Sequence, residues 1–327
     1  MNFEFQSKAN LTLTEDFQVF APRNIIYKDS TSLILMNTET GEKSRYFPAC
    51  REIHSFLVSP LRQWVFVIER NAAPRILIYN FDFELINTLE GLMPFLIDQI
   101  CYDHVSNLLV VRSEDELIWI DIERAIRLEV SLPPGLLQDF RQFSTHPRDK
   151  KKILLLSEKN VAMYTLEPSL KSQNFSEPTC FSLERVGCST VFELTDEYND
   201  SFCTFVWAKT DLIYIATKNS SVLLVNVINF QKVNKIKINK VPESMFLTKH
   251  ALFILDQNSD FLVYELNDKL EILGDSPSSD FNVSTGKISR PIVDIHTKEM
   301  LGIVDGREVF KAKLPEDKNE DAAGDNH

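Results

Sequence analysis

Glycine is scarce in this chain. Only nine of its 327 residues are glycine, whereas average proteins contain about 7%. Glycine adopts a positive φ without steric cost, so it normally occupies many tight turns. We therefore expect the turns of this protein to rely on Asn, Asp and Ser instead.

Long apolar runs are also absent. No stretch of about 18 apolar residues could span a bilayer as a helix, and the polar N-terminal segment with Glu4 and Lys8 does not resemble a signal peptide. The five cysteines are an odd number without metal-type spacing. They are Cys50, Cys101, Cys180, Cys188 and Cys203. We expect reduced, buried thiols in a cytoplasmic protein that does not contact membranes.

Positive charge is in deficit. The chain has 35 Lys and Arg against 47 Asp and Glu, a formal net charge of −12. Because an acidic surface repels the phosphate backbone, we expect no nucleic-acid partner. Hydrophobic residues make up 44% of the chain and include 23 Phe, so a large core can form.

Short apolar runs, in contrast, recur along the chain. One run rich in Ile, Leu, Val and Tyr occurs seven times at intervals of about 40 residues, the period of a four-stranded propeller blade. The occurrences are Ser32–Asn37, Arg75–Asn80, Glu116–Asp121, 160–165, Ser221–Asn226, 261–265 and 308–312. Each follows a second apolar run across a short polar turn, which is typical of a hairpin. Both runs are continuous rather than alternating, which indicates strands buried on both faces.

Flanking runs complete the repeat. Residues 55–60 and 140–147 each end in a polar residue and a proline, which suits a turn between strands. More polar runs at 42–47, 84–89, 126–130, 232–238 and from Glu271 onward are expected as outermost strands. Lys232, Lys235, Lys237 and Lys240 on one of them would protect that edge against pairing with other chains.

These patterns predict an all-β fold, a seven-bladed WD40-like β-propeller with degenerate repeats. We expect one domain over residues 1–314, in which residues 3–13 supply the outer strand of the last blade. Residues 167–200 are expected as an inserted loop, and residues 315–327 as an acidic disordered tail. The repeat signature is weak, because the Gly-His pair is absent and Trp-Asp has become Ile120-Asp121 or Val225-Asn226.

Motifs for catalysis are missing as well. The sequence holds no P-loop, Gly-x-Gly-x-x-Gly, Gly-x-Ser-x-Gly or His-Glu-x-x-His, and its six histidines are scattered. We therefore expect no enzyme, no catalytic residue, no metal and no cofactor.

One basic run stands out, and it lies in a predicted turn. Arg148, Lys150, Lys151 and Lys152 are the candidate protein-contact residues. They would contact an acidic partner such as a tubulin tail or a phosphorylated peptide; the alternative is an ordinary solvated turn.

Several segments resemble one family. Residues 24–41, residues 74–91 and residues 205–215 are similar to blades of the cilia- and flagella-associated WD-repeat proteins of the axonemal tether complex. The resemblance implies a non-catalytic scaffold in the axoneme of motile cilia or sperm flagella, within the cytoskeleton. Its implied partners are axonemal WD-repeat proteins, inner-arm dynein and tubulin. The family also has a second propeller and a long helical region, so the chain resembles a short, single-propeller form.

Two other functions fit the same fold. One is a general cytosolic adaptor in ubiquitin ligation, ribosome assembly or vesicle traffic. The other is a propeller hydrolase that holds a metal in its channel with ligands from several blades.

Overall fold

The computed structural model describes most of the chain between residues 17 and 313. The described residues are 17–21, 23–29, 32–46, 52–69, 74–94, 97, 99–103, 107–113, 116–132, 136, 140–149, 151–168, 180–185, 191–193, 200–248, 251–258, 260–267, 272–273, 279–282, 288–294, 299–304 and 308–313. The predicted N-terminal strand at residues 3–13 and the predicted tail at residues 315–327 lie outside this part of the chain.

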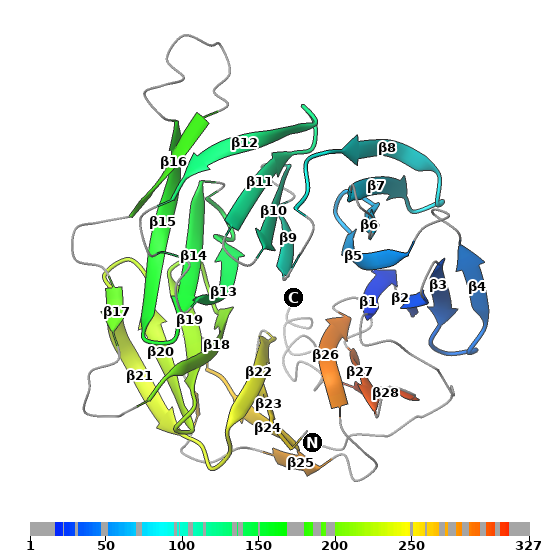
Figure 1. Cartoon of the computed structure of the whole chain (residues 1–327). Helices are drawn as coiled ribbons and strands as arrows, with labels where there is room; N and C mark the ends of the chain where they lie inside the picture. Colours follow the sequence, from blue (N-terminus) through cyan, green and yellow to red (C-terminus); the bar gives the residue numbers. More distant parts are fainter. Residues whose placement is uncertain are drawn as a thin grey trace, which may run out of the picture. The chain divides into compact units, whose positions relative to one another are not determined.

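Every regular element that the structure describes is a β-strand (Figure 1). The strands are β1 (Phe17–Ala21), β2 (Asn24–Asp29), β3 (Ser32–Asn37), β4 (Lys43–Tyr46), β5 (Ile53–Ser59), β6 (Trp64–Glu69), β7 (Arg75–Asn80), β8 (Leu85–Glu90), β9 (Gln99–Asp103), β10 (Leu108–Ser113), β11 (Glu116–Asp121), β12 (Ile126–Ser131), β13 (Phe140–Thr145), β14 (Lys152–Ser157), β15 (Asn160–Pro168), β16 (Cys180–Arg185), β17 (Val191–Glu193), β18 (Phe202–Trp207), β19 (Leu212–Thr217), β20 (Ser221–Asn226), β21 (Gln231–Lys237), β22 (Pro242–Leu247), β23 (Ala251–Asp256), β24 (Asp260–Glu265), β25 (Ser279–Asn282), β26 (Ile288–Asp294), β27 (Glu299–Val304) and β28 (Glu308–Lys313).

These strands form a succession of antiparallel meanders. In four of the sheets, the four strands lie side by side in the order of the sequence: β1–β4, β5–β8, β18–β21 and β22–β25. β26–β28 form a three-stranded sheet, and β9–β17 form a nine-stranded sheet that contains two meanders. All seven recurring apolar runs are third strands of these meanders, as the sequence predicts; in the first sheet, Asn24 of β2 pairs with Asn37 of β3. The number of blades stays a prediction.

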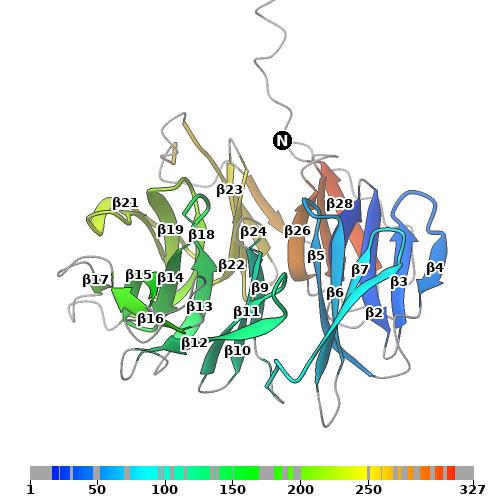
Figure 2. The same ribbon diagram turned by 90° about the horizontal axis from the view of Figure 1, so that it is seen from above.

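The nine-stranded sheet arises from one unexpected pairing. Residues 167–200 were expected as a loop, but their described part contains β16 and β17. β16 pairs antiparallel with β15 and, on its other side, parallel with β12 of the preceding meander. Figure 1 and Figure 2 both show β16 beside β12. The insertion therefore joins two meanders into one sheet.

A second correction concerns the fourth strand of the β22–β25 sheet. The run from Glu271 onward was expected to form it, but Ile272 makes only an isolated bridge to Leu266. The fourth strand is instead β25, which pairs with β24. Two apolar residues of an outer strand, Leu85 and Ile86 of β8, are 53% and 49% exposed.

The chain divides into two compact units. One unit comprises Met1–Phe47 with Ser284–His327, and the other comprises Pro48–Val283. In the first unit, β1 of the first sheet lies against β26 of the last, so segments near the two ends of the chain meet. The second unit contains the strands from β5 to β25.

The continuous apolar runs are buried on both faces, as predicted. In β14, Ile153 and Leu155 pack toward β10–β12, whereas Leu154 and Leu156 pack toward β18–β20. β20 repeats the pattern one sheet further on, since Leu223 and Val225 share the cluster of Leu154 while Val222 and Leu224 pack against β22–β24. Successive side chains of a strand point to opposite faces, so each middle strand needs apolar residues at every position.

Because glycine is scarce, other residue types adopt a positive φ in the turns. Positive φ angles occur at seven non-glycine residues that the structure describes: Arg23, Gln63, Phe83, Asn107, Ala125, Ser220 and Phe230. Only Asn107 and Ser220 among them are Asn, Asp or Ser, so most of these positions carry the steric cost of a left-handed conformation. Asn and Asp serve the turns in another way, as the sequence predicts, because Asn37, Asn80, Asp121 and Asn226 accept backbone amides there.

Candidate functional site

One end of each sheet carries the turn from the first to the second strand and the turn from the third to the fourth; we call it the turn end. At this end a backbone hydrogen bond links the turn before the second strand to the end of the third strand, or to the turn that follows it, in four of the meanders. The amide nitrogens of Thr38, Ile122, Leu166 and Val227 donate to the carbonyl oxygens of Arg23, Asn107, Lys151 and Asp211, at 2.7, 3.2, 2.7 and 2.9 Å. We call each of these bonds a backbone clamp. Because backbone groups make it, a clamp does not depend on the side chains at those positions.

A polar residue at the end of the third strand closes the adjoining turn. Asn226 Oδ1 accepts the amide of Ile228 at 2.8 Å, and Asp121 Oδ1 accepts that of Arg124 at 3.0 Å. Asn80 Oδ1 accepts the amides of Asp82 and Glu84. These are the degenerate Trp-Asp positions of the sequence, so the Asn or Asp retains a structural role there as a turn cap.

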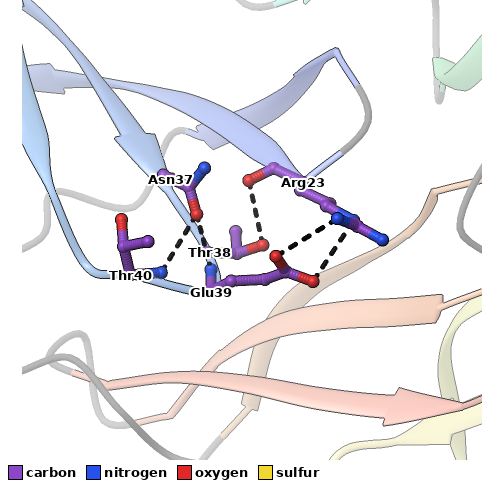
Figure 3. Close-up of polar contacts among 5 residues, drawn as sticks. All are labelled: Arg23, Asn37, Thr38, Glu39 and Thr40. Atoms are coloured by element: carbon purple, nitrogen blue, oxygen red, sulfur yellow. Dashed lines mark hydrogen bonds and ion pairs between the residues drawn. The ribbon is translucent and has the colours of Figure 1, made fainter.

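Figure 3 shows the same arrangement in the first sheet. Asn37 Oδ1 accepts the amides of Glu39 and Thr40 at 2.8 and 3.0 Å, and the Thr38 hydroxyl donates to the Arg23 carbonyl at 3.0 Å. The Arg23 guanidinium reaches Glu39 at 3.2 Å. Because both side chains are exposed, this ion pair adds little stability.

The predicted basic contact lies at the turn end, between β13 and β14. Arg148 and Lys151 are exposed and Lys152 begins β14, whereas Lys150 lies outside the described residues. Lys152 Nζ pairs with Asp149 at 2.8 Å, and Lys151 Nζ pairs with Glu167 at 4.0 Å. The hydrogen bond from Lys152 holds the pKa of Asp149 below its usual value. Two of the predicted contact lysines are thus already paired within the chain.

His146 fixes this turn and joins it to the next sheet. Its Nδ1 accepts the amides of Arg148 and Asp149 at 3.1 and 2.9 Å, so the ring proton must lie on Nε2. Nε2 is 2.8 Å from the carbonyl oxygen of Thr210, in the turn between β18 and β19. The His146 ring also meets Trp207 edge-on, with centroids 5.2 Å apart. The sequence could not identify this histidine as a link between two turns.

An exposed apolar residue belongs to the same surface. The turn holding Thr210 continues to Asp211, whose carbonyl accepts the amide of Val227. The next residue, Ile228, is 73% exposed. Arg148, Lys151, Lys209 and Ile228 therefore share one surface, which we call the turn face.

The opposite end, the hairpin end, carries the turn from the second to the third strand. There Glu69 is fully buried and pairs with Arg75 across the β6–β7 hairpin. Burial, together with the charge of Glu69, raises the pKa of Tyr79 to about 12. Arg75 also lies 3.7 Å from Glu90 of β8.

Asp200 forms a second polar centre at this end. Its Oδ1 accepts the amides of Ser201 and Asn219, both at 2.8 Å. Lys159, from the hairpin between β14 and β15, donates to the Asp200 carbonyl at 2.6 Å. Asp200 thus links the hairpins of two neighbouring sheets.

Nucleophiles and metal ligands are sparse in the described part of the chain. Cys101 and Cys203 form no disulfide, and burial raises the pKa of Cys203 to about 11. No three His, Cys, Asp or Glu side chains gather there into a possible metal site. No helix long and apolar enough to cross a membrane occurs among the described residues.

No protein-family model matches the sequence, and no curated protein does. Among solved structures 1559 chains match, as expected of a fold that serves many functions. One of them, from the crystal structure of a mitotic checkpoint complex, has a TM-score of 0.65 and 9% sequence identity; the match covers 95% of this chain and 91% of that chain. Such low identity informs on fold alone, and the fold is that of an all-β, WD40-like β-propeller.

Proposed function

We propose that the protein is a non-catalytic WD-repeat scaffold that binds other proteins through its turn face. The observation that carries the proposal is the fixed arrangement of exposed Arg148 and Ile228 on clamped turns. A surface held rigid before binding loses little entropy when a partner docks. An exposed isoleucine beside basic side chains offers an apolar anchor with a charged rim, the usual composition of a protein contact.

Within the turn face, we expect Arg148 and Ile228 to contribute most. Arg148 makes no ion pair with the side chains that the structure describes, whereas Lys151 and Lys152 neutralise Glu167 and Asp149. An incoming carboxylate would compete with existing partners at both lysines but not at Arg148. The acidic partner expected from the sequence would therefore contact Arg148 first.

Two variants test this surface. Arg148→Glu and Ile228→Ser should each weaken partner capture by about tenfold, the typical effect of removing one anchor residue, without changing the melting temperature. Ile86→Ser is the matched control, because Ile86 is also an exposed isoleucine, at 49%, but lies within the outer strand β8 and not in a turn. Equal capture by all four proteins, wild type included, would contradict the proposal.

A finer proposal places this scaffold in the axoneme of motile cilia or sperm flagella, with inner-arm dynein, tubulin or other axonemal WD-repeat proteins as partners. It is supported by the resemblance of residues 24–41, 74–91 and 205–215 to cilia- and flagella-associated protein 43 and its sister protein 44. These segments contain β2 with β3, β7 with β8, and most of β18 with β19.

The test of the axonemal role is the location of a tagged copy in tissue that builds motile cilia. Axonemal signal and co-purification with inner-arm dynein subunits would support it. Diffuse cytoplasmic signal with unrelated partners would overturn the axonemal role and leave a general adaptor.

A further inference from the structure

The outer edge of β21 is open in the described structure. β21 is the last strand of its sheet and pairs only with β20. Its outward backbone groups therefore face away from the sheet, where another extended segment can pair with them.

A β-bulge gives this strand an unusual distribution of charge. The register passes from Leu224↔Asn234 to Val225↔Lys232, so Val233 is the extra residue. Paired residues share a face of the sheet. Lys232, Lys235 and Lys237 stand opposite Val225, Leu223 and Ser221 respectively. Since residues 221, 223 and 225 alternate along β20, all three lysines lie on one face. Without the bulge, Lys232 would lie on the opposite face of the sheet, because it is three residues before Lys235.

These lysines form a positive strip on an acidic protein. All three side chains are exposed, and Lys232 and Lys237 make no ion pair with any side chain in the described ranges. The basic turn at Arg148 differs, because its described lysines are paired with carboxylates. Lys232 and Lys237 are therefore available to an external negative charge.

The protein already adds a strand to one such outer edge. β12 is the fourth strand of its meander, and its outer edge accepts β16 through Glu129↔Cys180, Val130↔Phe181 and Ser131↔Ser182. The outer edge of a fourth strand can thus accept a ladder of three residues, here from a strand that also pairs with β15. On β21, residues 234–237 form a regular stretch of similar length beyond the bulge.

We propose that β21 docks an extended acidic segment of a partner protein as a fifth strand of the sheet β18–β21. Acidic residues at every second position of that segment would stand beside Lys232, Lys235 and Lys237. The main chain would pair with the open edge. The proposal rests on the scaffold function above and adds a second surface and a partner chemistry to it.

The open edge favours a peptide over a nucleic acid. A peptide can satisfy the outward N–H and C=O groups of β21 and place its carboxylates at the same time. A nucleic acid can use only the charges, and the residues between Lys232 and Lys235 are Val233 and Asn234, which offer no ring for stacking bases.

Asn234 modulates access to this edge. Its Oδ1 accepts the amide of Lys235 at 2.7 Å, so one outward amide is capped by the strand itself. An incoming strand must displace this side chain. Asn234→Ala should therefore strengthen docking, whereas it would not affect purely electrostatic binding to the lysines.

Three peptides of about eight residues test the proposal by fluorescence anisotropy at low salt. The first alternates Glu and Thr, the second has the same composition in two blocks, and the third replaces Glu by Gln. We expect the alternating acidic peptide to bind about tenfold more tightly than either of the others, because only it forms several opposite-charge cross-strand pairs. Added salt should weaken its binding.

Charge reversal separates docking from simple edge protection. The triple variant Lys232→Glu, Lys235→Glu, Lys237→Glu keeps a charged edge, so it should remain monomeric, but it should lose the peptide. Arg148→Glu should bind the peptide normally. If the triple variant loses the peptide and still captures partners through the turn face, both surfaces exist.

Other results overturn the proposal. Equal affinity for the alternating and block peptides would show that β21 adds no strand, as would unchanged binding by Asn234→Ala. Tighter binding of a single-stranded oligothymidylate, displaced by the peptide, would assign the strip to phosphate polymers. The two proposals can fail separately. If Arg148→Glu loses partner capture but binds the peptide normally, the turn face and the β21 edge are independent sites.

Discussion

The two ends of the sheets are held together by different chemistry. At the turn end, the buried polar residues are the neutral Thr38, Ser59 and Asn107. At the hairpin end, the neutral Ser32, Thr217 and Ser221 are also buried, but so are the three carboxylates of Glu69, Asp200 and Asp256.

The difference explains why the repeats can degenerate. Backbone clamps and Asn or Asp caps recur from sheet to sheet at the turn end, so its side chains are left to vary and to contact partners. The hairpin end depends on individual charged groups, because a buried charge is tolerated only when it is paired or hydrogen-bonded. We therefore expect substitutions to affect stability most at the hairpin end and binding most at the turn end.

Arg75→Met should give the largest loss of stability. It leaves the carboxylate of Glu69 buried without its cation, which costs about 3 kcal/mol. Arg127→Met is the control, since Arg127 and Glu116 form an exposed ion pair whose loss costs little. Urea denaturation measures both. Adding Glu69→Leu to Arg75→Met should recover most of the loss; equal effects of the two Arg variants would contradict the comparison.

Asp200→Ala should rank second, with a loss of about 2 kcal/mol, because the amides of Ser201 and Asn219 lose a charged acceptor. Asp200→Asn keeps an oxygen at Oδ1 and should lose much less. If Asn and Ala destabilise equally in thermal denaturation, the hydrogen bonds to Ser201 and Asn219 do not carry the effect.

Alkaline pH should weaken the hairpin end through Cys203. Burial raises the pKa of this thiol to about 11, above its ordinary value of 9.0. The unfolded chain therefore loses the proton first, and stability falls as pH rises through that window. Urea midpoints at about pH 8 and about pH 10 should differ less in Cys203→Ser than in wild type. Tyr79 acts in the same direction at higher pH.

Asn37→Ala should cost about 1 kcal/mol, the usual contribution of a hydrogen-bonded turn cap. The backbone clamp between Thr38 and Arg23 remains, so the turn should keep its shape. A loss as large as that of Asp200→Ala would show that caps, rather than clamps, hold the turn end.

Ala125→Gly should have the smallest effect and the opposite sign. Ala125 has a φ of 53°, which glycine adopts without strain, so a gain of about 0.5 kcal/mol is expected. Glu123→Gly, in the same turn but without a positive φ, should stabilise nothing. A small rise in melting temperature for the first variant alone is the expected result.

The sequence predicted strands better than it predicted contacts. Arg75–Asn80, Glu116–Asp121 and Ser221–Asn226 were expected with the bounds that the structure shows, because continuous apolar runs between polar turns carry a strong local signal. The parallel pairing of β16 with β12 was missed. It depends on two segments far apart in the chain, and the short run at 180–185 has no feature that identifies its partner.

The site was predicted only in part. The sequence indicated a basic turn at Arg148. It could not show that the neighbouring Lys151 and Lys152 form ion pairs with carboxylates of the same chain. Ile228 gave no signal, because an exposed isoleucine and a buried one look alike in a sequence. Lys232 was expected only to protect an edge, since the bulge that aligns it with Lys235 appears only in the register.

The pairing of β12 with β16 also constrains how the protein is made. During synthesis β12 emerges well before β16, so its outer edge stays open until the insertion has been translated. The two meanders joined by β16 then gain or lose that ladder together, which makes them one cooperative unit rather than two independent repeats. Hydrogen exchange at Val130 should therefore report the opening of both.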